Sequence, residues 1–147
     1  MTAPYRVLVT GSRDWPSYDV VWLALDAAFC QAANARRVLT VVHGACPTGA
    51  DAHTVDWATH MIARDLPVKV EPHPAKGHPT QNFGPWPGAG PRRNRYMVSL
   101  GANLCLAFLG PCTRPNCRQP GPHDSHGASG CADLARTAGI PVKEIRP

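Results

Sequence analysis

The segment Tyr5–Trp15, YRVLVTGSRDW, decides the fold class of this chain. Its first part is a short apolar, β-branched run that stops at a glycine, which is typical of a strand buried on both faces. Similar runs recur along the chain, at residues 38–43, 68–71, 104–109 and 142–145. Segments with helical spacing alternate with these runs, at residues 19–33, 50–64, 92–100 and 128–138.

Short, continuously apolar strands joined by helices favour a parallel sheet that is covered on both faces. We therefore predict an α/β fold, a Rossmann-like three-layer sandwich around a mostly parallel five-stranded sheet. The length of 147 residues suits a single domain, residues 1–147. Ligands of such folds bind beyond the carboxyl ends of the strands, so the residues after each strand are candidate site residues.

Small residues mark the faces that the helices are expected to bury. The first helix has an alanine-rich stripe, which predicts burial of Val20, Ala24, Ala27 and Ala28. The last helix has a second such stripe, which predicts burial of Ala128, Cys131, Ala132 and Ala135.

The net charge of +5 is compatible with an anionic ligand, although the 15 basic residues are spread along the chain. The sequence has no apolar run of the length that a membrane span needs, and its start lacks the apolar core of a signal peptide. We therefore expect a cytoplasmic protein with no membrane partner. In that compartment, we expect cysteines to be metal ligands or free thiols rather than to form disulfides.

The loop after the first strand, TGSRDW, contains residues suited to a phosphate. Gly11 allows close backbone approach, Ser12 can donate a hydrogen bond, and Arg13 can pair with the negative charge. The loop has neither the G-x-G-x-x-G nor the P-loop pattern, so neither of those nucleotide-binding modes is indicated. It could also serve only as a connection.

The loop after the second strand, HGACPTGADA, runs from His43 into a helix. Gly44 and Gly49 flank a tight turn, and the exposed N–H groups of a helix N-terminus suit an anion. Asp51 lies in the first helical turn, where it could contact a ligand or only complement the helix dipole. His43 could likewise be a strand-end histidine with a structural partner.

Basic residues crowd the start of the third helix, in the segment GPRRNRYM at residues 90–97. Positive charge at a helix N-terminus is unfavourable unless an anion or another partner offsets it. The group formed by Arg92, Arg93, Asn94 and Arg95 could hold that anion, remain a solvated basic patch, or contact a second copy of the chain in a homo-oligomer.

Together these three segments resemble the YspA-like branch of the SLOG superfamily. Its members are Rossmann-like domains related to the Lonely Guy phosphoribohydrolases and to DNA-processing protein A. The resemblance covers about residues 5–111 and 127–147. It implies a pocket at the strand carboxyl ends that binds a nucleotide or nucleotide-derived small molecule. The binding positions that it implies are Gly11, Ser12, Arg13, His43, Gly44, Gly49, Asp51, Arg93 and Asn94.

The chain departs from the motif of the hydrolase relatives, P-G-G-x-G-T-x-x-E. Its glycine–threonine pair corresponds to Gly127-Ala128, and its catalytic glutamate corresponds to Cys131. This leaves open whether the protein is an enzyme. An N-glycosidic hydrolase would have to use Asp51, Asp124 or Asp133 as its carboxylate. A third alternative is nucleic-acid binding, although the sequence lacks a basic stripe with interleaved aromatic residues.

The segment CTRPNCRQPGPHDSH, residues 112–126, has no aliphatic or aromatic side chain. Such a segment cannot fold by apolar burial, but metal coordination can order it. We predict a structural zinc bound by four of five candidate ligands, within a zinc-binding insertion at residues 110–127. The candidates are Cys112, Cys117, His123, His126 and Cys131. The alternative is a flexible loop whose thiols happen to lie close together.

A long loop with five prolines and four glycines precedes the third helix, at residues 73–91. Loops of this length in compact domains are often functional or disordered. Trp86 in this loop could stack on a base as a lid, or it could anchor the loop to the body. We expect the anchor.

Overall fold

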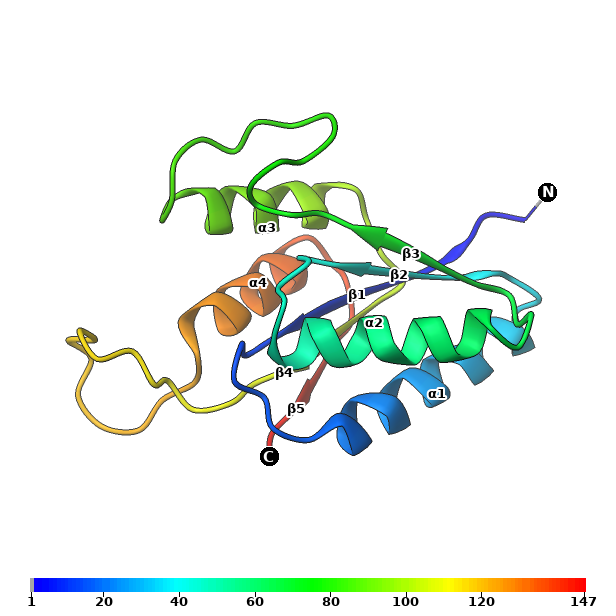
Figure 1. Cartoon of the computed structure of the whole chain (residues 1–147), viewed down its shortest axis with the longest axis horizontal. Coiled ribbons are helices and arrows are strands. Elements are labelled where there is room, and N and C mark those ends of the chain that lie inside the picture. The colour runs from blue at the N-terminus through cyan, green and yellow to red at the C-terminus, as the bar shows by residue number, and fades with distance from the viewer. Residues whose placement is uncertain (1) are drawn as a thin grey trace.

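The computed structural model describes residues 2–147 and contains one five-stranded sheet in which every strand pair is parallel (Figure 1). The strand order is β3-β2-β1-β4-β5, with β1 in the centre. The strands are β1 Tyr5–Gly11, β2 Leu39–His43, β3 Val68–Pro72, β4 Leu104–Phe108 and β5 Val142–Ile145. The predicted α/β fold is confirmed, and the sheet is wholly rather than mostly parallel.

Helices cover both faces of the sheet, which makes three layers (Figure 1). The helices α1 and α2 lie on one face and α3 and α4 on the other. Their bounds are α1 Tyr18–Asn34, α2 Gly49–Ile62, α3 Ala89–Ser99 and α4 His126–Thr137. Within residues 2–147, none of the helices has both the length and the apolar character needed to cross a bilayer.

Successive side chains of β1 enter the core on opposite faces of the sheet. Val7 and Val9 pack on the side of α1 and α2, whereas Leu8 packs on the side of α3 and α4. Successive strand side chains point to opposite faces, so an unbroken apolar run is needed when both faces are covered. This requirement explains why the strands could be recognised from sequence.

The predicted stripe of α4 is confirmed, but the predicted stripe of α1 is partly wrong. The buried residues of α1 are Val21, Ala24, Leu25, Ala28 and Ala32. Ala27 is exposed and Val20 is half-buried, whereas Val21 and Leu25 lie on the face toward the sheet. Apolar residues all around a helix leave its orientation to packing.

The start of α3 also differs from the prediction. The helix begins at Ala89, three residues before the predicted Arg92. Pro91 is therefore the third residue of the helix, where its missing N–H has no acceptor to lose. The glycines and prolines of this stretch had indicated a loop.

Ser12 joins the end of β1 to the start of α2 and to the end of β4. Its N–H donates to the Phe108 carbonyl, its own carbonyl accepts the Ala50 N–H at 3.2 Å, and its hydroxyl accepts the Gly110 N–H at 2.8 Å. This crossing of β1 and α2 needs a glycine at position 49, where φ is +69°. A Cβ there would lie 2.5 Å from the Arg13 carbonyl carbon and 2.6 Å from its oxygen.

We expect Gly49→Ala to lower the free energy of unfolding by more than about 3 kcal/mol, because it combines backbone strain with backbone overlap. Gly139→Ala is the matched control. Gly139 has a φ of +79°, but a Cβ at this position would have no other atom within 4 Å, so its substitution should cost only about 1 kcal/mol. Chemical denaturation of both variants measures the difference, and equal losses would contradict the crowded crossing.

Candidate functional site

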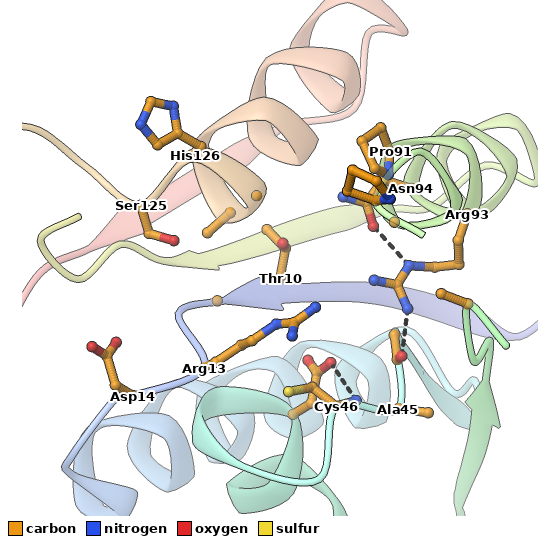
Figure 2. A pocket seen from close by; sticks show the side chains of 18 of the residues that line it. Thr10, Arg13, Asp14, Ala45, Cys46, Pro91, Arg93, Asn94, Ser125 and His126 are labelled. Carbon is orange, nitrogen blue, oxygen red and sulfur yellow. Dashed lines mark hydrogen bonds between the residues drawn. The ribbon is translucent and has the colours of Figure 1, made fainter. Parts of the chain in front are cut away.

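A cavity of about 810 Å³ opens at the carboxyl ends of β1, β2 and β4. Its walls come from the loops after these strands, from the start of α3, from the start of α4 and from the long loop before α3. Figure 2 shows Arg13, from the end of β1, and Arg93, from α3, extending into the space above β1 from opposite sides. The cavity therefore lies where an open parallel sheet is expected to bind its ligand.

The structure brings six of the nine predicted ligand-binding residues to the cavity wall: Gly11, Arg13, Gly44, Asp51, Arg93 and Asn94. The other three, Ser12, His43 and Gly49, lie behind the wall. Ser12 and Gly49 form the crossing of β1 and α2, and the His43 side chain is only 2% exposed. A direct ligand contact by any of the nine stays a prediction.

The two arginines of the cavity differ in how the protein holds them. Nη1 of Arg93 donates to the carbonyls of Gly44 and, at 3.1 Å, of His73, while Nε donates to Oδ1 of Asn94 at 2.8 Å. Arg13, by contrast, has no hydrogen-bond acceptor within residues 2–147 and lies with its guanidinium 4.8 Å from the ring centre of Trp86. Arg93 therefore braces two loops, and Arg13 is available to a ligand.

The basic start of α3 has partners in the protein itself. Arg93 binds loop carbonyls as described, and Nε of Arg92 donates to the Phe83 carbonyl at 2.6 Å. These carbonyl dipoles offset part of the positive charge that the sequence places at this helix end. A bound anion is not required to explain Arg92.

Asp51 is a nearly buried carboxylate in the cavity wall, with 8% of its surface exposed. Its Oδ2 accepts the Cys46 N–H at 3.1 Å. Burial raises the pKa of Asp51 to about 6, against the opposing effects of the Cys46 N–H and the charge of Arg93. Asp51 thus carries a proton part of the time near neutral pH, which an exposed aspartate does not.

His43 is held as a neutral side chain beside the cavity. Its Nδ1 accepts the Ala45 N–H at 3.0 Å, so the proton resides on Nε2. Nε2 is buried and has no acceptor within residues 2–147. Burial, followed by the charges of His73 and Arg93, lowers the pKa of His43 to about 4.

Four of the five predicted metal ligands form a cluster that could hold a metal ion. The ligand atoms of Cys112, Cys117, His123 and His126 all lie within 4.8 Å of one another. Nε2 of His123 and Nε2 of His126 lie 3.2 Å apart, and they lie 3.3 and 3.2 Å from Sγ of Cys117. A tetrahedral zinc site with ordinary bond lengths places its ligand atoms about 3.3–3.8 Å apart, so the cluster has suitable dimensions.

The tautomer of His123 also suits a metal. Its Nδ1 lies 2.8 Å from the Gly121 carbonyl and must donate to it, which leaves the Nε2 lone pair facing the cluster. Metal-binding histidines commonly donate their second nitrogen to a carbonyl in this way. Hydrogen bonds from the Gln119 N–H and from His126 lower the pKa of Cys117 to about 6, which favours the thiolate that metals bind.

The fifth candidate, Cys131, lies outside the cluster. It is fully buried on α4, in the part of the core that also contains Cys105. Burial raises the pKa of Cys131 to about 11, so it is a neutral thiol. The residue at the position of the relatives' catalytic glutamate is therefore a core side chain.

The three carboxylates considered for hydrolysis are separated by the fold. Asp124 pairs with Arg146 at 2.8 Å, and Asp133 pairs with Arg136 at 2.9 Å. Neither lines the cavity, whereas Asp51 does. Of the three, only Asp51 can act on a ligand in this cavity.

The long loop supplies Trp86 to the cavity, and also Pro74 and Lys76, which no sequence pattern had located. Its base is ordered by a hydrogen-bonded chain in which His73 lies 2.8 Å from both Glu71 and His78. The rings of His78, Phe83 and Tyr96 pack beside this chain. The residue types were visible in the sequence, but their meeting depends on how the loop folds back on α3.

The raised pKa of Asp51 and the lowered pKa of His43 should make the stability of the fold change with pH in opposite directions. Asp51 keeps its proton to a higher pH in the folded state than the usual value of 3.8, so its ionisation destabilises the fold by up to about 3 kcal/mol as pH rises from about 4 to 6. Neutral His43 stabilises the fold above its unfolded pKa of 6.5, and that contribution is lost as pH falls toward 4.

We therefore expect Asp51→Asn to become more stable relative to wild type as pH rises from 4 to 7, by about 2–3 kcal/mol. His43→Asn should change in the opposite direction over the same range, which makes it an internal control. Urea denaturation of the three proteins at several pH values tests this. Parallel pH profiles for wild type and Asp51→Asn would contradict a buried, partly protonated Asp51.

Comparison with known proteins agrees with this architecture. A sequence profile of the YspA, cpYpsA-related SLOG family matches residues 5–76, which contain β1, α1, β2, α2 and β3. A protein of Mycobacterium phage D29, described as Gene 61 protein, is 37% identical over 139 residues, and the match covers 93% of each chain. The parallel sheet, the loops after β1 and β2 and the sequence match lead to the same assignment: the chain belongs to the YspA, cpYpsA-related SLOG family.

Proposed function

We propose that the protein binds a nucleotide or nucleotide-derived small molecule in the cavity at the sheet edge, and that a structural zinc orders one wall of this cavity. The observation that carries the proposal is the placement of Arg13. It is an exposed guanidinium at the carboxyl end of the central strand, inside the cavity and without a hydrogen-bond acceptor within residues 2–147.

The charge and size of the cavity support an anionic ligand. Arg13, Lys76, Arg93 and Arg114 line it, against the carboxylates Asp14 and Asp51. The α2 N-terminus, whose N–H groups favour anions, adjoins the same space. A cavity of about 810 Å³ falls within the size range of small-molecule and cofactor sites.

The Cys/His cluster is built into the same cavity. Cys112 and His126 belong to the cluster and also line the cavity. The segment between them has few other supports, chiefly the Pro111–Asp124 bridge and the Cys112 N–H to His123 carbonyl hydrogen bond of 2.7 Å. Four protein ligands would leave zinc no open position, so its role would be structural.

We expect purified protein to bind one of the four ribonucleoside 5′-monophosphates and Arg13→Ala to weaken that binding about 10- to 100-fold, because a charge-assisted hydrogen bond to phosphate is lost. Isothermal titration calorimetry measures the affinities. Arg118→Ala removes the same charge from an exposed position that does not line the cavity, so it serves as the control.

Unchanged affinity in both Arg13→Ala and Asp51→Asn would contradict the proposed site. Strong weakening by Arg118→Ala and a steep loss of binding with salt would instead favour an extended nucleic-acid contact. Arg93 is a poorer test residue, because its removal would also release the loops that it braces.

We also expect the purified protein to contain one zinc ion, and Cys117→Ser to lose it. Cys131→Ser should retain the metal, because Cys131 lies in the core. Elemental analysis gives the stoichiometry, and cobalt substitution reports thiolate ligands by visible absorption. Zinc retained at full stoichiometry by Cys117→Ser and lost by Cys131→Ser would overturn this assignment.

Limited trypsin digestion separates local from global effects of the metal. Arg118 is followed by Gln119 in the Cys/His segment, whereas Arg114 precedes a proline and resists trypsin. Chelation should therefore loosen this segment and speed cleavage at the exposed Arg118–Gln119 bond while the sheet stays folded. Zinc removal without any change in cleavage would indicate that the metal does not order this segment.

Hydrolysis of an N-glycosidic bond is the second candidate function, and Asp51 is the observation that favours it. Its pKa of about 6 would let a buried carboxyl donate or accept a proton near neutral pH. Analysis of the nucleotide mixtures for released base distinguishes the two functions. Tight binding without turnover supports a binding protein, and base release that disappears in Asp51→Asn supports a hydrolase.

A further inference from the structure

Trp86 differs from the other tryptophans of the chain. Trp15 and Trp57 are buried, and the ring of Trp22 packs against Tyr18 and His60. Trp86 is 59% exposed and lines the cavity. Its ring faces the guanidinium of Arg13, which is itself free of hydrogen-bond acceptors within residues 2–147.

Trp86 is not the main anchor of the long loop, contrary to the expectation from sequence. The loop is held by the buried Phe83 side chain, by the hydrogen bond from Arg92 to the Phe83 carbonyl, and by the His73–His78 pair at its base. The edge of the Trp86 ring approaches Gly90 of α3, which limits its position without burying its face. The position of the indole is thus limited by α3, while most of its surface stays exposed.

We infer that Trp86 is the base-stacking residue of the cavity, and that the nucleobase takes the place of Arg13 against the indole while Arg13 turns to the phosphate. This inference rests on the proposed nucleotide binding. An exposed cation–π contact is weaker than either a charge-assisted hydrogen bond to phosphate or the stacking of a base on an aromatic ring. The exchange therefore replaces one weak contact with two stronger ones.

The arrangement also divides the cavity by chemistry. Trp86 lies in the loop before α3, and Arg13 extends from the end of β1 beside the α2 N-terminus. A ligand with its base on Trp86 and its phosphate near Arg13 would span these two elements. Stacking selects for a flat aromatic group without reading its hydrogen-bonding edge, so we expect modest preference among the four bases.

The test compares ligands with and without a base, using the four ribonucleoside 5′-monophosphates and ribose 5-phosphate. We expect Trp86→Ala to weaken nucleotide binding about tenfold or more and to leave ribose 5-phosphate binding unchanged. Trp86→Phe should restore most of the nucleotide affinity, because it keeps an aromatic face. Leu23→Ala, at a 70% exposed apolar position on α1, controls for the loss of an exposed side chain.

Intrinsic fluorescence gives a second readout of the same contact. Nucleotide should quench wild-type emission, and Trp86→Phe should lose that quenching while it still binds. Nucleotide affinity in Trp86→Ala equal to that of wild type overturns the stacking role. Equal wild-type affinities for nucleotide and ribose 5-phosphate overturn it as well.

The outcomes separate this inference from the proposed function. If Arg13→Ala weakens nucleotide binding and Trp86→Ala does not, the nucleotide site stands and the stacking role fails. If wild-type protein binds none of these phosphate-bearing probes, the proposed function fails and the inference fails with it.

Discussion

The cavity depends on one crossing of the backbone, where the end of β1 meets the start of α2 and the end of β4. Ser12 makes this crossing with three hydrogen bonds, to Phe108, Ala50 and Gly110. Glycine is required at position 49 because the two backbones touch there. The crossing brings Arg13 and Asp51 to the same wall and holds them there without using their side chains.

The remaining walls are built from segments with little apolar burial of their own. One is the long loop, which an aromatic and histidine cluster around His73 and Phe83 holds against α3. The other is the Cys/His segment, whose four candidate ligand residues converge without an apolar core. The sheet edge thus supplies the part of the cavity that backbone hydrogen bonds hold, and side-chain clusters hold the rest.

Within residues 2–147, the charged groups of the cavity wall are not neutralised by ion pairs with one another. Burial favours the neutral form of both Asp51 and His43, and their contributions to stability change with pH in opposite directions. Arg93 is satisfied by carbonyls and contributes its charge to the site without depending on Asp51 for a hydrogen bond. An anion that enters would therefore meet positive charge that no carboxylate fully cancels.

The sequence by itself determined the order of strands and helices and the parallel sheet, because doubly buried strands need unbroken apolar runs. It also indicated the Cys/His segment, since ligand spacing is local. Only the tertiary structure decided that Cys131 is a core thiol, that Ser12 braces the fold, and that Trp86 stays exposed over Arg13. Those roles depend on which distant backbones meet, and such contacts leave no periodic pattern along the chain.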